Sequence, residues 1–357
     1  MNTTERIELL RRALRAKKID VLIVSHLPNI RYLCGFSGSN GLLLVTPSTT
    51  MFFTDFRYDE QVRTEVTADE LSVTQTDLLR YAAGKNILRR SKKIAFEQHH
   101  LSLERYLFLQ KKFRRERLAG TENLVENLRA AKDDTEIALI AEASAISDRV
   151  FQKIIGMLKP GISELEISAE ISYLHKSYGA EGDAFETIVA SGVRGALPHG
   201  KASSKKIESG EFMTLDFGCV VNGYHSDMTR TVCIGKPSAE MKKVYGIVLE
   251  AQQRAADAVR TTATGKEVDT AARGYIASRG YGKYFGHSLG HGVGLEIHEQ
   301  LRLSQKNKKK LTLNNVVTVE PGIYLPTKFG VRIEDIVVVR RDGCEVLTGS
   351  PKELIVL

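Results

Sequence analysis

The sequence predicts two domains, an α/β domain followed by an α+β domain whose helices cover one face of a curved antiparallel sheet. At 357 residues the chain exceeds the usual size of a single hydrophobic core. Short apolar runs alternate with helical segments in its first third, and an Asn-Gly pair separates two strand-like segments in its middle third. We place the domains at residues 1–127 and 128–357.

The first domain begins with a helix predicted over residues 4–17, where apolar residues recur at helical spacing. The runs DVLIVS, GLLLV, MFFT and KIAFE are predicted strands, and LSLERYLFLQKKF is a further helix. These elements predict a small α/β domain.

The second domain begins with a long helix after the segment NLRAAKDDTE. Asp133 is a candidate N-cap with Glu136 three residues on, and the helical pattern continues until a Lys-Pro-Gly stop at 159–161. Further helices are predicted near 163–178, 238–260 and 266–279, and they alternate with strands.

The Asn-Gly pair predicts a tight hairpin within FMTLDFGCVVNGYHSDMTRTVCIG. If these two residues form the loop, Val221 faces Tyr224 and Gly218 faces Asp227. Asp216 and Asp227 then lie diagonally on one face, about 7 Å apart at the backbone, because side chains alternate. Two buried carboxylates this close would repel unless a cation joined them. Two unrelated acids on a solvated hairpin are the alternative.

A second acidic pair follows a similar pattern. The segment TVEPG at 318–322 resembles TLDFG at 214–218, and each precedes a turn and a returning strand. Glu320 stands before a Pro-Gly turn signal, and Glu334 lies in the returning strand GVRIEDIVVV, where an unpaired acid would be costly. This similarity predicts a duplicated unit with pseudo-twofold symmetry and a site on its axis.

The segment YFGHSLGHGVGLEIHE supplies histidines between the two acidic pairs. His287 and His291 are four residues apart, as in a helical zinc motif, but the surrounding glycines predict loop and strand. The glycine spacing also lacks the flanking strand and helix of a dinucleotide-binding loop. His291 is a candidate fifth ligand, with a hydrogen-bonded core histidine as the alternative.

The order and surroundings of these residues resemble the pita-bread metallopeptidases, the family of methionine aminopeptidase, aminopeptidase P and prolidase. The segments SGVRGALPHG, LDFG, SDMTRT, HSLGHGVGLEIHE, VEPGIY and GVRIED are similar to those of short bacterial and archaeal Xaa-Pro peptidases. The segments NIRYLCGFSGSNG and FFTDFRYDEQ resemble the creatinase-type N-terminal domain of those enzymes. All five metal-ligand positions of the family are filled, by Asp216, Asp227, His291, Glu320 and Glu334.

The resemblance implies a site for two divalent cations. Asp216 would bind one ion and His291 and Glu320 the other, while Asp227 and Glu334 would bridge both. An oxygen-rich shell with one imidazole favours Mn²⁺, with Co²⁺, Zn²⁺ and Fe²⁺ as alternatives. Two such ions would lower the pKa of a bridging water and supply hydroxide at neutral pH.

The resemblance also implies roles around the ions. Glu320 would act as the proton shuttle, and His199 and His298 would hydrogen-bond the scissile region and stabilise the oxyanion. His287 resembles a wall of the proline pocket. Arg302 occupies the position that binds the product carboxylate in archaeal prolidases.

The predicted activity follows from the family branch. The N-terminal domain argues against methionine aminopeptidases, so we expect an Xaa-Pro aminopeptidase that cleaves before proline, with an Xaa-Pro dipeptidase (prolidase) as the alternative. Arg302 favours the dipeptidase, although aminopeptidase P relatives can carry arginine there and Leu301 stands where proline is common. Arg332 is expected to face the substrate site and support the metal carboxylates, with a structural salt bridge as its alternative.

Two non-peptidase alternatives share the fold. Creatinase works without metal and lacks the full ligand set, and non-catalytic pita-bread modules lose ligands and gain long charged extensions. All five ligands are present here and no such extension is seen, which favours an enzyme. Relatives with this N-terminal domain are usually dimers, so we expect a homodimer.

Composition excludes other classes. The net charge is +8, but the charge is scattered, tryptophan is absent and no nucleic-acid-binding motif occurs, so we expect no nucleic-acid partner. No stretch approaches the roughly 20 apolar residues of a membrane span, and no membrane partner is expected. Four cysteines without C-x-x-C spacing predict a reducing, cytoplasmic environment.

Overall fold

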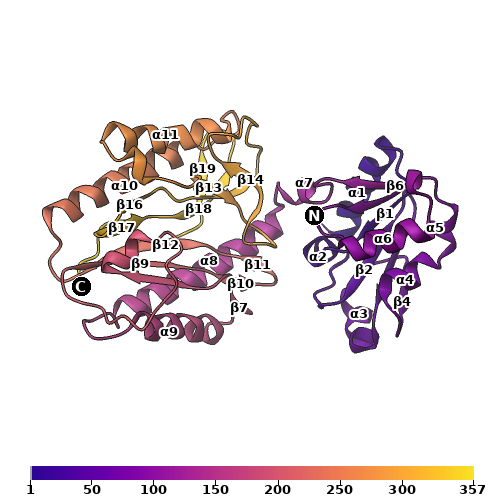
Figure 1. Ribbon diagram of the computed structural model, residues 1–357, viewed down its shortest axis with the longest axis horizontal. Helices are drawn as coiled ribbons and strands as arrows, with labels where there is room; N and C mark the ends of the chain where they lie inside the picture. The colour runs from indigo at the N-terminus through magenta and orange to yellow at the C-terminus, as the bar shows by residue number, and fades with distance from the viewer. Residues whose placement is uncertain (1) are drawn as a thin grey trace. The chain divides into compact units, whose positions relative to one another are not determined.

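The computed structural model describes residues 2–357 and divides the chain into two compact units (Figure 1). The first unit ends at Arg129 and the second begins at Ala130. Each unit has its own hydrophobic core.

The first unit contains a six-stranded mixed sheet of order β4-β3-β2-β1-β5-β6. Strand β1 is buried along its whole length, as expected for a strand that is covered on both faces. The strands are β1 (Val21–Val24), β2 (Gly41–Val45), β3 (Thr50–Thr54), β4 (Glu70–Val73), β5 (Ile94–Glu97) and β6 (Leu118–Thr121). All four predicted strands of this domain are therefore confirmed.

Seven helices accompany this sheet within the described residues. Both predicted helices are confirmed, as α1 and α6, and the other five were not predicted. One of these, α2, has ordinary helix boundary signals in Pro28 in its first turn and the left-handed Gly35 at its end. The helices are α1 (Thr3–Ala16), α2 (Leu27–Cys34), α3 (Asp59–Glu65), α4 (Leu78–Ala83), α5 (Asn86–Arg90), α6 (Leu103–Lys112) and α7 (Glu126–Arg129).

The second unit is built from two halves, each with a pair of helices packed on antiparallel strands. In the first half, α8 (Asp134–Ile155) and α9 (Glu164–Ser177) share a core with the sheet β12-β9-β8. Its strands are β8 (Ile188–Ser191), β9 (Glu211–Phe217) and β12 (Met228–Ile234), and a smaller sheet contains β7 (Gly182–Asp183), β10 (Cys219–Val221) and β11 (Tyr224–His225).

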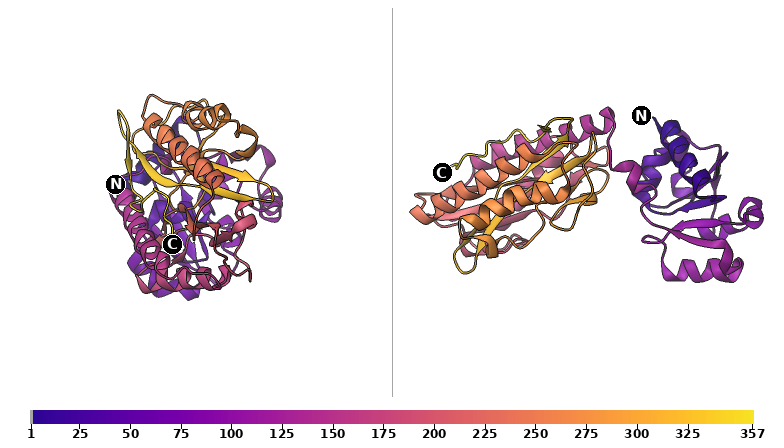
Figure 2. Two further views of the ribbon diagram at one scale, coloured as in Figure 1. Left: turned by 90° about the vertical axis from the view of Figure 1, so that its left-hand side faces the viewer. Right: turned by 90° about the horizontal axis from the view of Figure 1, so that it is seen from above.

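The second half repeats this construction. Helices α10 (Ala239–Ala258) and α11 (Gly265–Ser278) lie side by side and share a core with the strands of this half (Figure 2). The larger sheet has the order β14-β13-β15-β18-β19, and β16 pairs with β17. The strands are β13 (Gly290–Gly292), β14 (Glu299–Leu303), β15 (Val316–Val319), β16 (Gly322–Leu325), β17 (Phe329–Arg332), β18 (Asp335–Val339) and β19 (Cys344–Val346).

The helices of this unit begin where their capping residues predict. Asp133 accepts the backbone N–H of Glu136 and Glu136 accepts that of Asp133, so the predicted capping box of α8 is confirmed. Ser163 and Glu166 make the same arrangement at α9.

In both long hairpins the strand pairing is interrupted near the middle, but the residues pair in the same register before and after the interruption. In the first, Val221 pairs with Tyr224 and Phe217 with Met228, which confirms the predicted register on both sides of the break. In the second, β15 pairs with β18 up to Val319, and β16 pairs with β17 from Gly322. The acidic residues of the sequence lie at these two breaks.

Candidate metal centre

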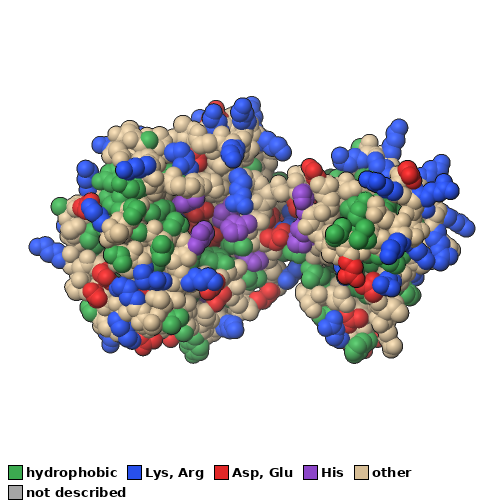
Figure 3. Space-filling model, viewed as in Figure 1, with side chains coloured by type: hydrophobic (Ala, Val, Ile, Leu, Met, Phe, Trp, Pro, Cys, Tyr) green, Lys and Arg blue, Asp and Glu red, His purple; other side chains and the backbone are tan. Residues whose placement is uncertain are grey.

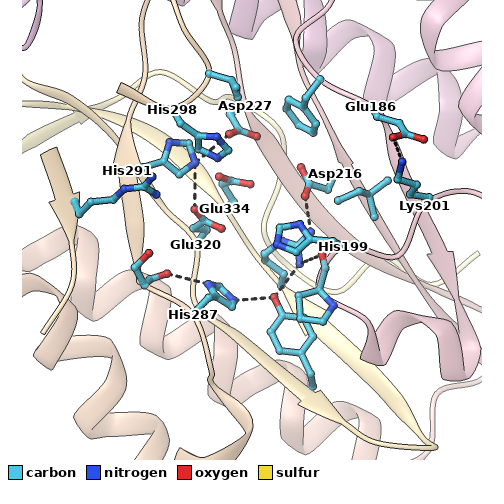
Figure 4. A pocket seen from close by; sticks show the side chains of 18 residues that line it. Glu186, His199, Lys201, Asp216, Asp227, His287, His291, His298, Glu320 and Glu334 are labelled. Carbon is cyan, nitrogen blue, oxygen red and sulfur yellow. Dashed lines mark hydrogen bonds and ion pairs between the residues drawn. The ribbon is translucent and has the colours of Figure 1, made fainter. Parts of the chain in front are cut away.

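The second unit contains a cavity of about 490 Å³ into which the acidic residues and histidines of the sequence converge. Figure 3 shows histidine and acidic side chains gathered in a hollow on this unit, and Figure 4 shows how they point toward one another. Every residue that the sequence assigned to the site lines this cavity: Asp216, Asp227, Glu320, Glu334, His199, His287, His291, His298, Arg302 and Arg332.

The first hairpin brings Asp216 and Asp227 to one face, as predicted. Asp216 pairs with Thr229 across β9 and β12, and Asp227 lies two residues before Thr229 on the returning strand. The glycine opposite Asp227 is required by the backbone, because a Cβ atom on Gly218 would lie 1.9 Å from the carbonyl oxygen of Ser226. The missing side chain therefore permits the two strands to approach closely at the break in the ladder.

The second hairpin brings Glu320 and Glu334 to facing positions just beyond the Val319–Asp335 pair. The Glu334 carboxylate accepts the Thr229 hydroxyl at 2.6 Å, so the two hairpins are joined at the site. Thr318 donates its hydroxyl to Glu320 at 3.1 Å.

His291 lies on strand β13 rather than on a helix, as the glycines predict. Its Nδ1 lies 3.1 Å from the carbonyl oxygen of Gly292, to which it donates, and this leaves the Nε2 lone pair directed at the acids. Nε2 is 3.4 Å from Glu320 and 3.6 Å from Asp227. Burial lowers the pKa of His291 to about 3, so the ring is neutral and able to bind a metal.

The buried carboxylates need a cation. Burial, reinforced by neighbouring carboxylates, raises the pKa of Asp227 and of Glu334 well above their usual values, and burial raises that of Glu320 to about 7. Ligand atoms of Asp227, His291 and Glu334 all lie within 4.8 Å of one another. Within residues 2–357, Oδ1 of Asp216 is buried without a hydrogen-bond partner. These features fit divalent cations held by oxygen and imidazole ligands.

Arg332 contacts Asp216 directly and is 3% exposed. Its Nε donates to Thr229 at 3.0 Å and its Nη1 to the Tyr324 hydroxyl at 2.8 Å. The guanidinium is therefore occupied by protein partners, and the geometry favours the support of the metal carboxylates over direct contact with substrate.

Tyr324 is a site residue that the sequence analysis missed. Its hydroxyl donates to Nε2 of His287 at 2.9 Å, while Nδ1 of His287 donates to the Ser288 carbonyl at 2.8 Å. Burial lowers the pKa of His287 to about 4, so its ring is neutral. A tyrosine in an apolar strand carries no sequence signal that distinguishes it from a core residue.

Two further histidines and an arginine line the cavity. The rings of His298 and His291 stack edge to face with centroids 4.3 Å apart, and His199 is exposed. Burial lowers the pKa of His298. Arg302 pairs with His291 across β13 and β14, where a β-bulge follows and Leu301 adopts a left-handed φ of 90°. The bulge turns the strand at the point where Arg302 enters the cavity wall.

Two buried or half-buried histidines outside the cavity have partners of their own. His175 is buried with Nδ1 at 2.7 Å from Asp183, and His225 hydrogen-bonds the Gly294 carbonyl. The four cysteines are free thiols, and no helix among residues 2–357 is long and apolar enough to cross a membrane.

The fold and this cluster of buried carboxylates with one neutral imidazole define a metal-dependent hydrolase. Residues 138–341 match Metallopeptidase family M24, and residues 6–131 match the Creatinase/Prolidase N-terminal domain. The chain belongs to family M24, which confirms the predicted pita-bread metallopeptidase with a creatinase-like N-terminal domain.

Similar proteins cover the whole chain. It is 38% identical over 342 residues to the Xaa-Pro dipeptidase of Pyrococcus horikoshii, covering 94% of this chain and 95% of that one. The structure of an Xaa-Pro dipeptidase from Bacillus anthracis is similar with a TM-score of 0.96, 43% identity and full coverage of both chains. An X-Pro aminopeptidase from Thermotoga maritima has a TM-score of 0.90 and 41% identity, with 98% and 99% of the two chains covered.

Proposed function

We propose that this metallopeptidase is a proline-directed exopeptidase whose preferred substrates are Xaa-Pro dipeptides. The observation that carries the proposal is the cavity in which a buried carboxylate and imidazole cluster lies beside Arg302. Two of the three similar proteins described above are named Xaa-Pro dipeptidases, which supports the predicted alternative over the aminopeptidase expected first.

We assign the ions as the resemblance implies. Asp216 would hold one ion, His291 and Glu320 the other, and Asp227 and Glu334 would bridge them. Mn²⁺ is our first choice for both positions, since four carboxylates and one imidazole form a hard shell without thiolates. When bound, such ions supply Lewis acidity and an activated water at neutral pH.

The chain's own residues then handle the proton and the substrate. Glu320 lies beside His291 at the centre of the cluster and would take a proton from the attacking water and deliver it to the leaving proline nitrogen. His298 and His199 reach the cavity and would donate hydrogen bonds to the oxygen of the scissile carbonyl. His287, oriented by Tyr324, would form a wall of the proline pocket.

Arg302 would select dipeptides by binding the free carboxylate that follows proline. A guanidinium matches a carboxylate with two parallel hydrogen bonds, and a longer peptide has an uncharged amide at that position. The left-handed backbone at Leu301 is unfavourable for a leucine, so the strand is held in a strained form beside Arg302.

The test compares Ala-Pro with Ala-Pro-Ala in the presence of Mn²⁺, Co²⁺ or Zn²⁺, in wild type and Arg302→Ala. We expect Mn²⁺-dependent cleavage of the dipeptide, little cleavage of the tripeptide, and a rise in KM for Ala-Pro of about 10-fold or more in the variant, since hydrogen bonds to charged groups contribute about 1.5–3 kcal/mol. Lys306→Ala, which removes an exposed cation from the following loop, should leave KM unchanged. Equal cleavage of both peptides would indicate an aminopeptidase, and an unchanged KM in Arg302→Ala would remove the carboxylate-binding role.

The homodimer, the cytoplasmic location and the metal identity remain predictions. Elemental analysis of the purified protein tests the last of these, and sedimentation tests the first. A protein that neither binds metal nor gains activity with it would instead be a non-catalytic pita-bread module.

A further inference from the structure

The segment between Ser191 and Ser203 carries His199 into the cavity. Its chain includes a 3₁₀ turn at Gly192–Ala196 and then runs through Pro198 and His199. Among residues 2–357, the His199 ring makes no side-chain hydrogen bond, so the position of the ring depends on the backbone of this segment. Whatever holds the backbone therefore determines where the His199 side chain enters the cavity.

One buried carboxylate contacts this segment at both of its ends. Glu164, the first residue of α9, is 0% exposed. Its Oε1 accepts the backbone N–H and the hydroxyl of Ser191 at 2.8 and 2.9 Å. Its Oε2 accepts the backbone N–H and the hydroxyl of Ser203 at 3.1 and 2.7 Å, and Nε of Arg194 at 2.9 Å.

Arg194 extends this grip toward His199. Its Nη2 donates to the carbonyl oxygen of Lys201, two residues after the histidine. On the other side of the histidine, the Pro198 carbonyl accepts from Arg332 at 3.2 Å. The backbone is thus held on both sides of His199. On the Pro198 side it is held by Arg332, which also contacts the metal carboxylate Asp216. On the Lys201 side it is held by Arg194, which is bound in turn by Glu164.

Glu164 is not needed to begin its own helix. At the N-terminus of α9, the capping box pairs the backbone N–H groups of Ser163 and Glu166 with each other's side chains. The backbone N–H groups of Glu164 and Leu165 donate to the carbonyl oxygens of Lys205 and Ser203, so the Glu164 carboxylate takes no part in capping the helix. All five hydrogen bonds that Glu164 accepts come from the segment and its two ends, and bonds to a carboxylate are about twice as strong as neutral ones. A buried carboxylate with this set of partners suits the closure of a loop better than the support of a helix.

We propose that Glu164 is a positioning residue that fixes the 191–203 segment and, through it, places His199 for the reaction. The role of His199 rests on the proposed function, whereas the fixing of the segment does not. Glu164 does not line the cavity, so it acts only through the segment.

The test uses the full chain loaded with Mn²⁺ and the substitution Glu164→Gln, which keeps the shape of the side chain but places an amide among donors. We expect amide hydrogen exchange within residues 192–203 to become at least 10-fold faster while exchange elsewhere in α9 and β9 is unchanged. For Ala-Pro, kcat should fall about 10- to 100-fold, somewhat less than the 10²–10³-fold cost of losing an oxyanion donor outright. Mn²⁺ affinity should stay within about twofold of wild type.

A double-mutant cycle separates positioning from general damage. In a His199→Ala background, Glu164→Gln should lower kcat by less than about twofold, because the group it positions is gone. Glu170→Gln, which changes a partly exposed acid further along the same helix, is the matched control and should match wild type in kcat and in exchange. If Glu164→Gln does not fold, Ser203→Ala removes one hydroxyl donor and should show the same pattern at about 3- to 10-fold.

Two results would overturn the inference: unchanged exchange in the 192–203 segment, or a full additive loss of kcat in the His199→Ala background. A wild type that cleaves no Xaa-Pro peptide would refute the proposed function instead, and the exchange measurement would still decide whether Glu164 fixes the segment.

Discussion

Removal of the metal ions should make the second unit lose stability as the pH rises. Burial raises the pKa of Glu320 from an ordinary 4.5 to about 7 in the metal-free fold. A group whose pKa is raised by folding stabilises the fold fully below its unfolded pKa, and this contribution is lost as the pH rises through the folded value. At about 1.4 kcal/mol per pH unit, a shift of this size in the carboxylate cluster corresponds to about 3 kcal/mol. Asp227 and Glu334 act in the same direction.

The assay compares urea unfolding of chelator-treated and Mn²⁺-loaded protein between pH 5 and pH 8 at constant ionic strength. The metal-free protein should lose at least about 3 kcal/mol relative to the loaded protein over this range, because cations neutralise the carboxylates that otherwise repel one another. Metal-free Glu320→Gln should lose less than metal-free wild type. Glu353→Gln, which changes an exposed acid, should show the wild-type slope.

A difference between loaded and metal-free protein that stays constant from pH 5 to pH 8 would refute this reasoning. It would mean that the carboxylates are compensated within the protein, for example by Arg332, rather than by ions. Calorimetry offers a second check, since Mn²⁺ binding near pH 6 should release protons from the site.

Two other substitutions test the geometry of the site. Gly218→Ala should destabilise the protein by about 1–3 kcal/mol and weaken Mn²⁺ binding, because the new methyl group would clash with the Ser226 carbonyl. Gly246→Ala in α10 is the control: its methyl group meets no atom within 4 Å, and it should stabilise the protein by about 0.5–1 kcal/mol. Urea unfolding measures the stability of both variants and calorimetry their Mn²⁺ affinity, and equal effects would contradict the role of the close approach. Tyr324→Phe removes the hydroxyl that orients His287, so kcat/KM for Ala-Pro should fall about 10-fold while the circular dichroism spectrum stays unchanged. Wild-type kinetics in this variant would show that the hydrogen bond does not matter for the reaction.

The parts of the site that local chemistry dictates could be predicted from the sequence. An Asn-Gly loop fixes the register of its hairpin, and register alone puts Asp216 and Asp227 on one face. The likeness between TLDFG and TVEPG correctly paired Glu320 with Glu334, because both segments build a hairpin that breaks at its acidic residues.

The parts that depend on tertiary contacts could not be predicted in this way. The hydrogen bond between His287 and Tyr324 joins residues 37 positions apart, and neither periodicity nor motif spacing indicates such a pair. Glu164 reads as an ordinary acid in the first turn of a helix, and only the fold shows that its partners lie 27 to 39 positions away. Strand alternation correctly predicts that Arg332 faces the cavity, but alternation does not predict that Arg332 pairs with Asp216.

The unbroken register of the second hairpin also determines where the chain tolerates a change in length. One residue added between Glu320 and Leu325 would shift every pairing beyond it and turn alternate side chains to the wrong face. Residues added at the turn 326–328 would leave those pairings intact, and all three residues of that turn are exposed. Leu325 is five residues from Glu320, or about 17 Å along an extended strand. The turn is therefore a position at which a reporter peptide could be inserted without reaching the carboxylates.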